Sequence, residues 1–356
     1  MTREALIVMN CKCPWTSFKS RQQYLALELV KYFDVLYLQD GEKFRPRIHM
    51  LETGLYIGDG ILCWYDRAFW HSNTNYRFFA DMAINQFSKR YRHVVIWNME
   101  NCHDLLAGVK ADIRIFDHID PCFSIDSRDV EDFNNRVAQL CEKADVVVAS
   151  APVLAADCMR FSDHVHLVKN ACIAGKPFEL SSHTKNIDLV WLGTLDNRID
   201  TSFVRRVCEA LTGKSVVFAG NMHSDVEREL RSVRNLQLLG PVTAEEGNNL
   251  LSRSKYGMIP YNSGYVGDRI NPVKLFEYIA HDVVPICLPN RSVDEFTDYV
   301  FSSDNVQVWS SVVTGGILPK LWDKRHLFLS QNTWAVRGIQ VQNLISRQLG
   351  LCVTDE

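Results

Sequence analysis

Short apolar runs alternate along the chain with segments whose apolar residues recur at helical spacing. The runs predict buried β-strands, and the periodic segments predict helices that bury one face. We predict strands at residues 4–10, 34–39, 59–65, 93–99, 111–118, 144–150, 187–193, 214–220, 235–240, 256–261 and 283–289. We predict helices at residues 20–33, 130–144, 199–211, 224–233, 243–254, 271–281 and 331–349. Strands alternating with helices are typical of parallel sheets covered on both faces.

A polar stretch divides this pattern into two halves. Residues 174–186 carry Gly, Pro, Ser and charges without periodicity, which indicates a linker. The alternation then restarts, so we expect an α/β protein with two doubly wound, Rossmann-like domains. We place them at residues 1–170 and 171–331, with a final helical segment at 332–356 that crosses back to the first domain. Ligands of such sheets bind outside the carboxyl ends of the strands, so we expect a cleft where the two domains face each other.

Composition and charge narrow the class of protein. The chain has 356 residues and 47% apolar content, enough for two hydrophobic cores. Its net charge of -3 gives no general attraction to nucleic acid, so we expect no nucleic-acid partner. The start of the sequence does not resemble a signal peptide, no apolar run is long enough to span a bilayer, and the cysteines are scattered in apolar segments. We therefore expect a cytoplasmic protein with free thiols.

Several common nucleotide-binding motifs are absent from the sequence. No G-x-G-x-x-G follows a predicted strand and opens a helix, and no P-loop is present. These absences disfavour dehydrogenases and NTPases. No D-x-D occurs either, so we expect neither a metal ion nor another cofactor.

One lysine occupies an unfavourable position at the start of a predicted helix. In "INPVKLFEYIAHDVVPI", Asn271 suits the N-cap and Pro272 the first helical position, which puts Lys274 in the first turn. A cation there opposes the helix dipole unless an anion occupies the helix N-terminus. Glu277 lies on the same face one turn later, where it could accept from the hydroxyls of a ribose. The alternative is a surface Lys274–Glu277 ion pair.

Two loops at the same predicted sheet edge could complete an anion site. The strand ending at Tyr261 leads into a loop with Gly264 and Gly267 that could close over a diphosphate. The strand ending at Gly193 leads into a loop with Arg198, whose guanidinium suits bidentate phosphate contacts. The alternative for this arginine is a solvated side chain.

These segments occur in an order that resembles a known family. The set "WLGTLDNRID", "VVFAG", "NLQLLGPVTAEEGNNLLSRSKYGMIPY" and "NPVKLFEYIAHDVVPI" is similar to the donor domain of GT-B glycosyltransferases. The similarity is greatest to the family 4 type and its relatives in polysaccharide assembly, including xanthan glucuronosyltransferase and teichuronic-acid enzymes. It covers roughly residues 188–289 well, and "P-x-K-L-x-E-Y-x-A" is its most specific part. The first half matches more weakly, through its opening helix and "IFDHIDPCF".

The resemblance implies roles for individual residues. Glu277 matches the glutamate that holds the donor ribose, and Lys274 and Arg198 match positions near the diphosphate. The turn at 240–242, which ends at Val242, matches the segment that lines the nucleobase. We include Gly193, Tyr261, Asn271 and Pro272 in the same donor site.

The resemblance also implies an acidic residue in the first domain and a helix that returns to it. Asp120, or Asp117 as the alternative, matches the acidic residue and would be the catalytic base if transfer inverts the sugar. Trp334 and Arg337 match the returning helix. The sequence departs from the family pattern at three places: Arg269 replaces a glutamate of the retaining pattern, Asn170-Ala171 replaces the usual Asn-Gly of the linker, and "HDVV" replaces the usual Gly before the last strand. Because that glutamate is missing, stereochemistry and donor sugar stay unassigned.

The first half combines aromatic and basic residues that suit an acceptor. We assign Trp15 and Arg21 to acceptor binding; such mixtures also suit a membrane interface, and the alternative is that most of these aromatics are core. We expect a glycosyltransferase that moves a sugar from a nucleotide-diphosphate sugar to a glycan or lipid-linked acceptor in cell-surface polysaccharide synthesis. Peripheral contact with the inner face of the cytoplasmic membrane fits this expectation. A nucleotide-sugar epimerase and a non-catalytic sugar-nucleotide-binding module are the alternatives.

Overall fold

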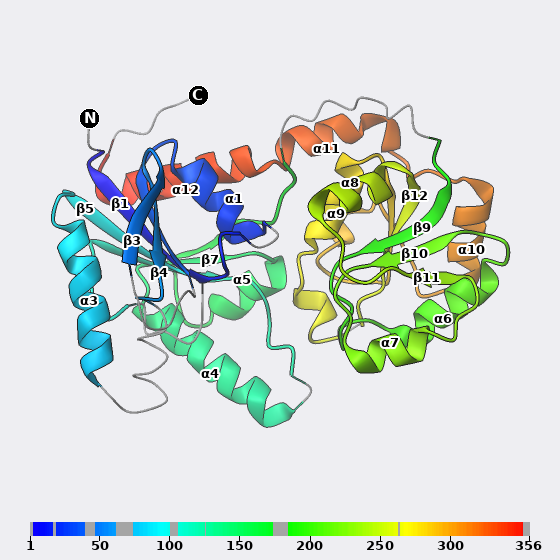
Figure 1. Ribbon diagram of the computed structural model, residues 1–356, viewed down its shortest axis with the longest axis horizontal. Coiled ribbons are helices and arrows are strands. Elements are labelled where there is room, and N and C mark those ends of the chain that lie inside the picture. The colour runs from blue at the N-terminus through cyan, green and yellow to red at the C-terminus, as the bar shows by residue number, and fades with distance from the viewer. Residues whose placement is uncertain are drawn as a thin grey trace. The chain divides into compact units, whose positions relative to one another are not determined.

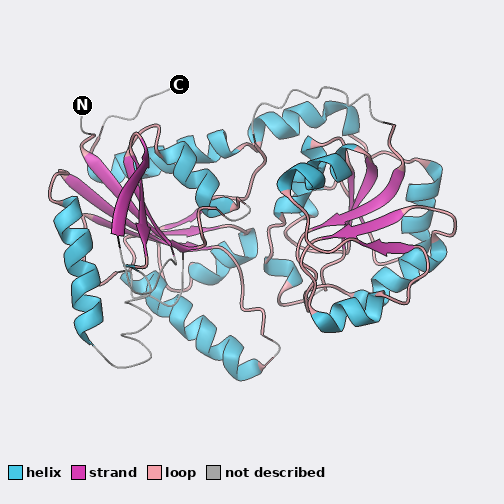
Figure 2. Cartoon of the chain, viewed as in Figure 1, coloured by secondary structure: helices cyan, strands magenta, loops and turns pink. Residues whose placement is uncertain are grey.

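The computed structural model describes residues 3–16, 19–39, 47–61, 74–99, 106–124, 126–173, 184–262 and 264–351. It divides into two compact units, one formed by Met1–Lys169 with Trp334–Glu356 and the other by Asn170–Thr333 (Figure 1). Each unit is an α/β domain built on a mostly parallel sheet (Figure 2). The predicted fold class is confirmed at this level.

The first unit contains a sheet in the order β3-β4-β2-β1-β5-β6-β7-β8. Among the described strands of this sheet, only the β3–β4 pair is antiparallel. The strands are β1 (Ala5–Lys12), β2 (Asp34–Gln39), β3 (Arg47–Glu52), β4 (Leu55–Asp59), β5 (His93–Asn98), β6 (Ile113–His118), β7 (Val146–Ala149) and β8 (Val165–Leu167). Its helices are α1 (Arg21–Leu29), α3 (Thr74–Ser88), α4 (Ser127–Lys143), α5 (Pro152–Cys158) and α12 (Trp334–Leu349).

Helices cover both faces of this sheet. Leu6 and Val8 of β1 join a hydrophobic cluster with Ala80 and Ile84 of α3. On the other side of the sheet, α1 packs against α12 (Figure 1). The Tyr24 ring stacks there on Trp334 with 5.3 Å between centroids. The C-terminal helix is therefore an integral part of the first unit.

The second unit has an entirely parallel sheet in the order β11-β10-β9-β12-β13-β14. Its strands are β9 (Ile187–Leu192), β10 (Val216–Ala219), β11 (Leu236–Leu238), β12 (Ser254–Ile259), β13 (Val284–Cys287) and β14 (Phe301–Ser302). Its helices are α6 (Thr201–Ala210), α7 (Ser224–Leu230), α8 (Ala244–Ser252), α9 (Val273–Ala280), α10 (Val306–Gly315) and α11 (Arg325–Gln331). The strand order reverses direction between β9 and β12, which makes their carboxyl ends the switch point of a doubly wound sheet.

Local sequence chemistry explains several of these boundaries. Asp200 caps α6, because its side chain accepts from the Phe203 N–H at 2.8 Å. Thr243 and Glu246 form a reciprocal capping box at the start of α8. Apolar strands of four to six residues then supply the buried centre of the sheet, as the predicted alternation requires.

Several predicted boundaries and elements differ from the structure. The prediction of a strand at 59–65 is wrong for residues 60–61, because β4 ends at Asp59 and Ile61 is helical. Residues 62–65 lie outside the described residues. The hairpin strands β3 and β4 were not predicted. The strand predicted to end at Tyr261 stops at Ile259.

Candidate functional site

The predicted donor-site residues of the second unit gather at the switch point of its sheet. Gly193 directly follows β9, and Tyr261 follows β12 by two residues. An isolated bridge joins Tyr261 to Ile199, and the Asn262 N–H donates to the Arg198 carbonyl at 2.8 Å. These backbone contacts hold the two loops side by side at the edge where doubly wound sheets bind ligands.

Lys274 lies directly over the end of β9. A Cβ placed on Gly193 would come within 2.3 Å of the Lys274 Cε and 2.6 Å of its Nζ. The Nζ also lies 3.5 Å from the Tyr261 hydroxyl. In the described part of the chain, no carboxylate oxygen approaches this ammonium within 4.0 Å. Lys274 therefore holds a positive charge at the sheet edge with no acidic group paired to it.

The start of α9 differs from its predicted form. Pro272, not Asn271, is the N-cap residue, and it offers no side-chain acceptor to the first turn. The Asn271 side chain instead accepts from the Asn170 N–H at 2.8 Å, and the Asn170 amide donates back to the Asn271 carbonyl at 2.6 Å. Because no capping side chain occupies it, the N-terminus of α9 keeps backbone donors next to Lys274.

Glu277 occupies the next turn of α9 and is half-buried. Burial raises the pKa of its carboxyl, and the positive charge of Lys274 partly opposes that shift. The structure thus places the two predicted residues close enough to interact, without a direct ion pair between them. A half-buried carboxylate with spare acceptor capacity is suited to a pair of hydroxyl groups.

Arg198 is held by a residue that sequence reasoning missed. Its Nε and Nη2 donate to both carboxylate oxygens of Asp196, at 2.6 to 3.0 Å, and its guanidinium carbon lies 5.8 Å from the centre of the Tyr261 ring. The spacing D-x-R within "LDNR" is the signal that could have identified Asp196. Arg198 is therefore a cation whose charge is largely balanced at the same sheet edge.

The turn predicted to line a nucleobase also lies at this edge. The Gly240 carbonyl, at the start of the turn, accepts from the Gly220 N–H at 2.7 Å, which ties the turn to the end of β10. Val242 is half-buried within it. Gly193 and Gly220 pack so closely that a Cβ on Gly220 would lie 2.1 Å from the Gly193 carbonyl oxygen.

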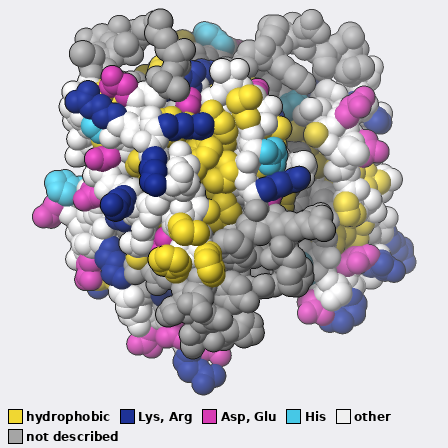
Figure 3. Space-filling model, turned by 60° about the vertical axis from the view of Figure 1, so that its left-hand side comes forward, with side chains coloured by type: hydrophobic (Ala, Val, Ile, Leu, Met, Phe, Trp, Pro, Cys, Tyr) yellow, Lys and Arg dark blue, Asp and Glu magenta, His cyan; other side chains and the backbone are white. Residues whose placement is uncertain are grey.

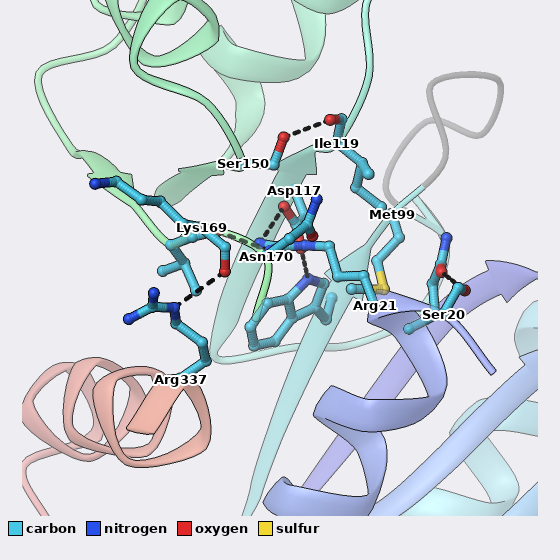
Figure 4. A network of polar contacts seen from close by, with 12 residues as sticks. Ser20, Arg21, Met99, Asp117, Ile119, Ser150, Lys169, Asn170 and Arg337 are labelled. Carbon is cyan, nitrogen blue, oxygen red and sulfur yellow. Dashed lines mark hydrogen bonds and ion pairs between the residues drawn. The ribbon is translucent and has the colours of Figure 1, made fainter. Parts of the chain in front are cut away.

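In the first unit, the structure gives Asp117 and Asp120 different environments. Asp117 is buried, and Arg21 donates to its two carboxylate oxygens at 3.0 Å each (Figure 4). The Trp97 indole N–H adds a third bond at 3.3 Å. Burial raises the pKa of Asp117, while Arg21 and Trp97 oppose that shift. Asp120 is exposed, two residues beyond the carboxyl end of β6.

The two predicted acceptor residues also differ. Arg21 is only 2% exposed, and it also donates to the Val168 carbonyl at 2.7 Å (Figure 4). Its guanidinium is thus used inside the domain, and we no longer assign it to direct acceptor contact. Trp15 is half-buried, with its ring edge-on to Tyr37 at 5.1 Å between centroids. A second group of aromatic residues in the first half, Trp64, Tyr65, Phe69 and Trp70, lies outside the described residues.

The described residues form neither a metal-binding cluster nor a helix that could span a membrane. No group of three or more His, Cys, Asp or Glu side chains in that part of the chain is arranged to hold a metal ion. None of the described helices has both the length and the apolar character needed to cross a bilayer.

Comparisons with known proteins identify the architecture. No protein-family model matches the chain, and no curated protein matches it significantly. Among solved structures, the chain is similar to a UDP-forming trehalose-phosphate synthase from Burkholderia vietnamiensis, with a TM-score of 0.69, 14% identity and 100% of both chains covered. It is also similar to HepE from Anabaena in complex with UDP and glucose, with a TM-score of 0.67, 8% identity, and coverage of 97% of this chain and 100% of that one.

A third solved structure extends the comparison. AviGT4, a glycosyltransferase involved in avilamycin A biosynthesis, gives a TM-score of 0.65 at 12% identity and covers 98% of this chain and 99% of its own. At such low identities these matches show the fold, which is that of GT-B glycosyltransferases: two Rossmann-like domains, each with a mostly parallel sheet. The family 4 assignment within that fold stays a prediction.

Proposed function

We propose that the protein is a metal-independent glycosyltransferase that takes its sugar from a nucleoside-diphosphate sugar. The observation that carries this proposal is Lys274, an ammonium beside the uncapped start of α9 that has no carboxylate partner among the described residues. The departing diphosphate carries the negative charge that such a site would stabilise. Structures of the same fold are described with UDP, which supports a uracil nucleotide as the donor.

The other donor-site residues have supporting roles in this proposal. Glu277 accepts hydrogen bonds from the ribose hydroxyls, and the turn ending at Val242 faces the base. Arg198, balanced by Asp196, contributes hydrogen-bond donors more than net charge. If transfer inverts the sugar, Asp120 accepts the proton of the acceptor hydroxyl, because it is the exposed member of the acidic pair.

We further propose that the acceptor is a glycan or a lipid-linked sugar of a cell-surface polysaccharide, and that the first unit contacts an anionic membrane. The support is the exposed face of α3, where Phe78, Phe79 and Met82 are 63%, 46% and 50% exposed. Lys89 and Arg90 are exposed just beyond its C-terminal end. Figure 3 shows hydrophobic side chains gathered on this side of the molecule, with Lys and Arg around them. Apolar residues bordered by cations suit a bilayer interface with acidic headgroups.

Thermal unfolding with nucleotides tests the donor assignment. The protein is heated with UDP, GDP, ADP and CMP and their common sugars, with and without EDTA. One nucleotide at 100 times its dissociation constant should add about 2.7 kcal/mol, with or without EDTA. Lys274→Met should abolish most of the gain, whereas Lys320→Met, at a lysine that is 82% exposed, should preserve it. No shift with any nucleotide would refute the proposal.

Two further assays separate the alternatives and the membrane contact. Turnover that requires an acceptor distinguishes a transferase from an epimerase, and any turnover excludes a non-catalytic binding module. Co-sedimentation with vesicles that contain phosphatidylglycerol should fall when Phe78 and Met82 are both changed to Ser. The matched control changes Ile317 and Leu318, which are 46% and 52% exposed in the second unit. Equal loss in both double variants would refute the α3 surface.

A further inference from the structure

The two cations of the donor site are held by chemically different neighbours. Arg198 is bound by a carboxylate, since both oxygens of Asp196 accept from it. Lys274 is surrounded by aromatic groups, with its Nζ 4.6 Å from the centre of the Trp191 ring and 3.5 Å from the Tyr261 hydroxyl. An ammonium at that distance over an indole face is within the range of a cation–π interaction.

The Trp191 ring is fixed in place from several sides. The side chain is fully buried in β9, and its indole N–H donates to the Gly193 carbonyl at 3.0 Å. The Tyr261 ring meets it edge-on, with 5.7 Å between centroids and 87° between planes. The indole therefore cannot turn away without breaking a hydrogen bond and an aromatic contact, and the face that it presents to Lys274 is preorganised.

We propose that Trp191 is a positioning residue for sugar-nucleotide binding, and that Trp191 and Tyr261 form an aromatic seat for the Lys274 ammonium. The seat fixes the lysine over the end of β9 but adds no negative charge, so the full charge is available to a diphosphate. A carboxylate in the same place would hold the lysine equally well and would compete with the phosphate oxygens. Trp191 acts through Lys274 and need not contact the ligand. This inference rests on the proposed donor site.

Affinity for ligands with and without a diphosphate tests this role. For Trp191→Leu we expect UDP to bind about five- to thirtyfold more weakly, the loss that one desolvated cation–π contact predicts. Uridine, which lacks the diphosphate, should bind as it does to the wild type. Trp191→Phe keeps an aromatic face and should recover much of the UDP affinity. In a Lys274→Met background, Trp191→Leu should cause no further loss. If UDP and uridine affinity fall together, Trp191 is only a scaffold residue and the proposal is wrong.

A second readout does not depend on nucleotide binding. Reductive methylation of lysines with a ¹³C label gives each dimethyl-lysine an NMR resonance, and the signal absent from Lys274→Met identifies residue 274. The Trp191 ring current should shift that signal upfield in the wild type and in Trp191→Phe, but not in Trp191→Leu. An unshifted wild-type signal would overturn the seat itself. A shifted signal in a protein that binds no nucleoside diphosphate would retain the contact and overturn both the donor site and the role of the seat in binding.

Discussion

Replacing Gly193 by alanine should remove Lys274 from the donor site without touching the lysine itself. The new Cβ would lie 2.3 Å from the Lys274 Cε and 2.6 Å from its Nζ, far inside contact distance. The end of a lysine side chain is flexible, so the structure would relieve the clash by moving the ammonium away from β9. Gly193 also has a φ of +143°, which L-residues rarely adopt.

Gly193→Ala should lower both the stability of the fold and the affinity for a nucleotide. The backbone conformation should destabilise the folded state by about 1–3 kcal/mol. Loss of the aromatic contacts of Lys274 adds about 0.5–2 kcal/mol. For nucleotide affinity, losing a charged hydrogen bond of about 1.5–3 kcal/mol corresponds to a factor of about 10 to 150 in the dissociation constant. Denaturant titration measures the total loss of stability, and calorimetric titration with UDP measures the loss of nucleotide affinity.

A control variant and a double variant separate the backbone strain at residue 193 from the displacement of the Lys274 side chain. Gly213 has a φ of +76° with open space around its Cβ position, so Gly213→Ala should lower stability by about 1–2 kcal/mol and leave UDP affinity unchanged. The three atoms nearest to a Cβ on Gly193 all belong to Lys274. In a Lys274→Ala background, Gly193→Ala should therefore show only its backbone cost and no further loss of affinity. Wild-type affinity in Gly193→Ala would refute the placement of Lys274 over β9.

The remaining predictions concern the carboxylates. Burial holds the pKa of Glu277 above its ordinary value, so its contribution to stability is largest below the ordinary pKa and falls as pH rises through the raised one. Glu277→Gln should consequently raise the Tm at neutral pH while weakening UDP binding; a lower Tm would contradict this sign. Asp120→Asn should preserve Tm and UDP affinity and lower turnover, and near-normal turnover would exclude Asp120 as the base. Asp117→Ala should lower the free energy of unfolding by about 3–5 kcal/mol, because it leaves Arg21 buried without its carboxylate, and a surface-like loss below 1 kcal/mol would contradict the buried ion pair.

The sequence was most informative where local chemistry decides the structure. The apolar strands of the second unit, the Asp200 cap of α6 and the position of Lys274 in the first turn of α9 all follow from neighbouring residues. The edge hairpin was missed because most residues of β3 are exposed and give no buried alternation. The strand predicted at 59–65 was misplaced because its apolar run continues past the point where β4 ends.

Contacts between distant segments account for the errors within the site. Asn271 has the preferred chemistry of an N-cap, but its side chain is engaged by Asn170, which is 101 positions away. Arg21, which the sequence led us to assign to acceptor binding, is buried because Asp117 on β6 supplies its counter-charge. In the sequence, Trp191 looks like an ordinary core residue of a strand. Lys274 reaches the face of the Trp191 ring only because α9 packs back against the end of β9. Such pairings depend on tertiary packing that no local pattern encodes.

Two of the departures from the family pattern, those at Asp282 and Arg269, have unequal consequences. Asp282 stands in the segment where the family pattern has a glycine before the last strand. Its φ is positive, at 57°, a conformation that Asp tolerates better than most residues. Its carboxylate is bound by Arg325 at 2.8 Å and by Lys185 at 3.1 Å, so ion pairs with other segments offset the local strain. Arg269 cannot replace the glutamate of the retaining pattern in the same way. Its guanidinium lies 4.3 Å from the Tyr265 ring centre, and it donates hydrogen bonds where a carboxylate would accept them. In the proposed donor site, Arg269 would therefore offer hydrogen-bond donors where the glutamate of the retaining pattern offers acceptors.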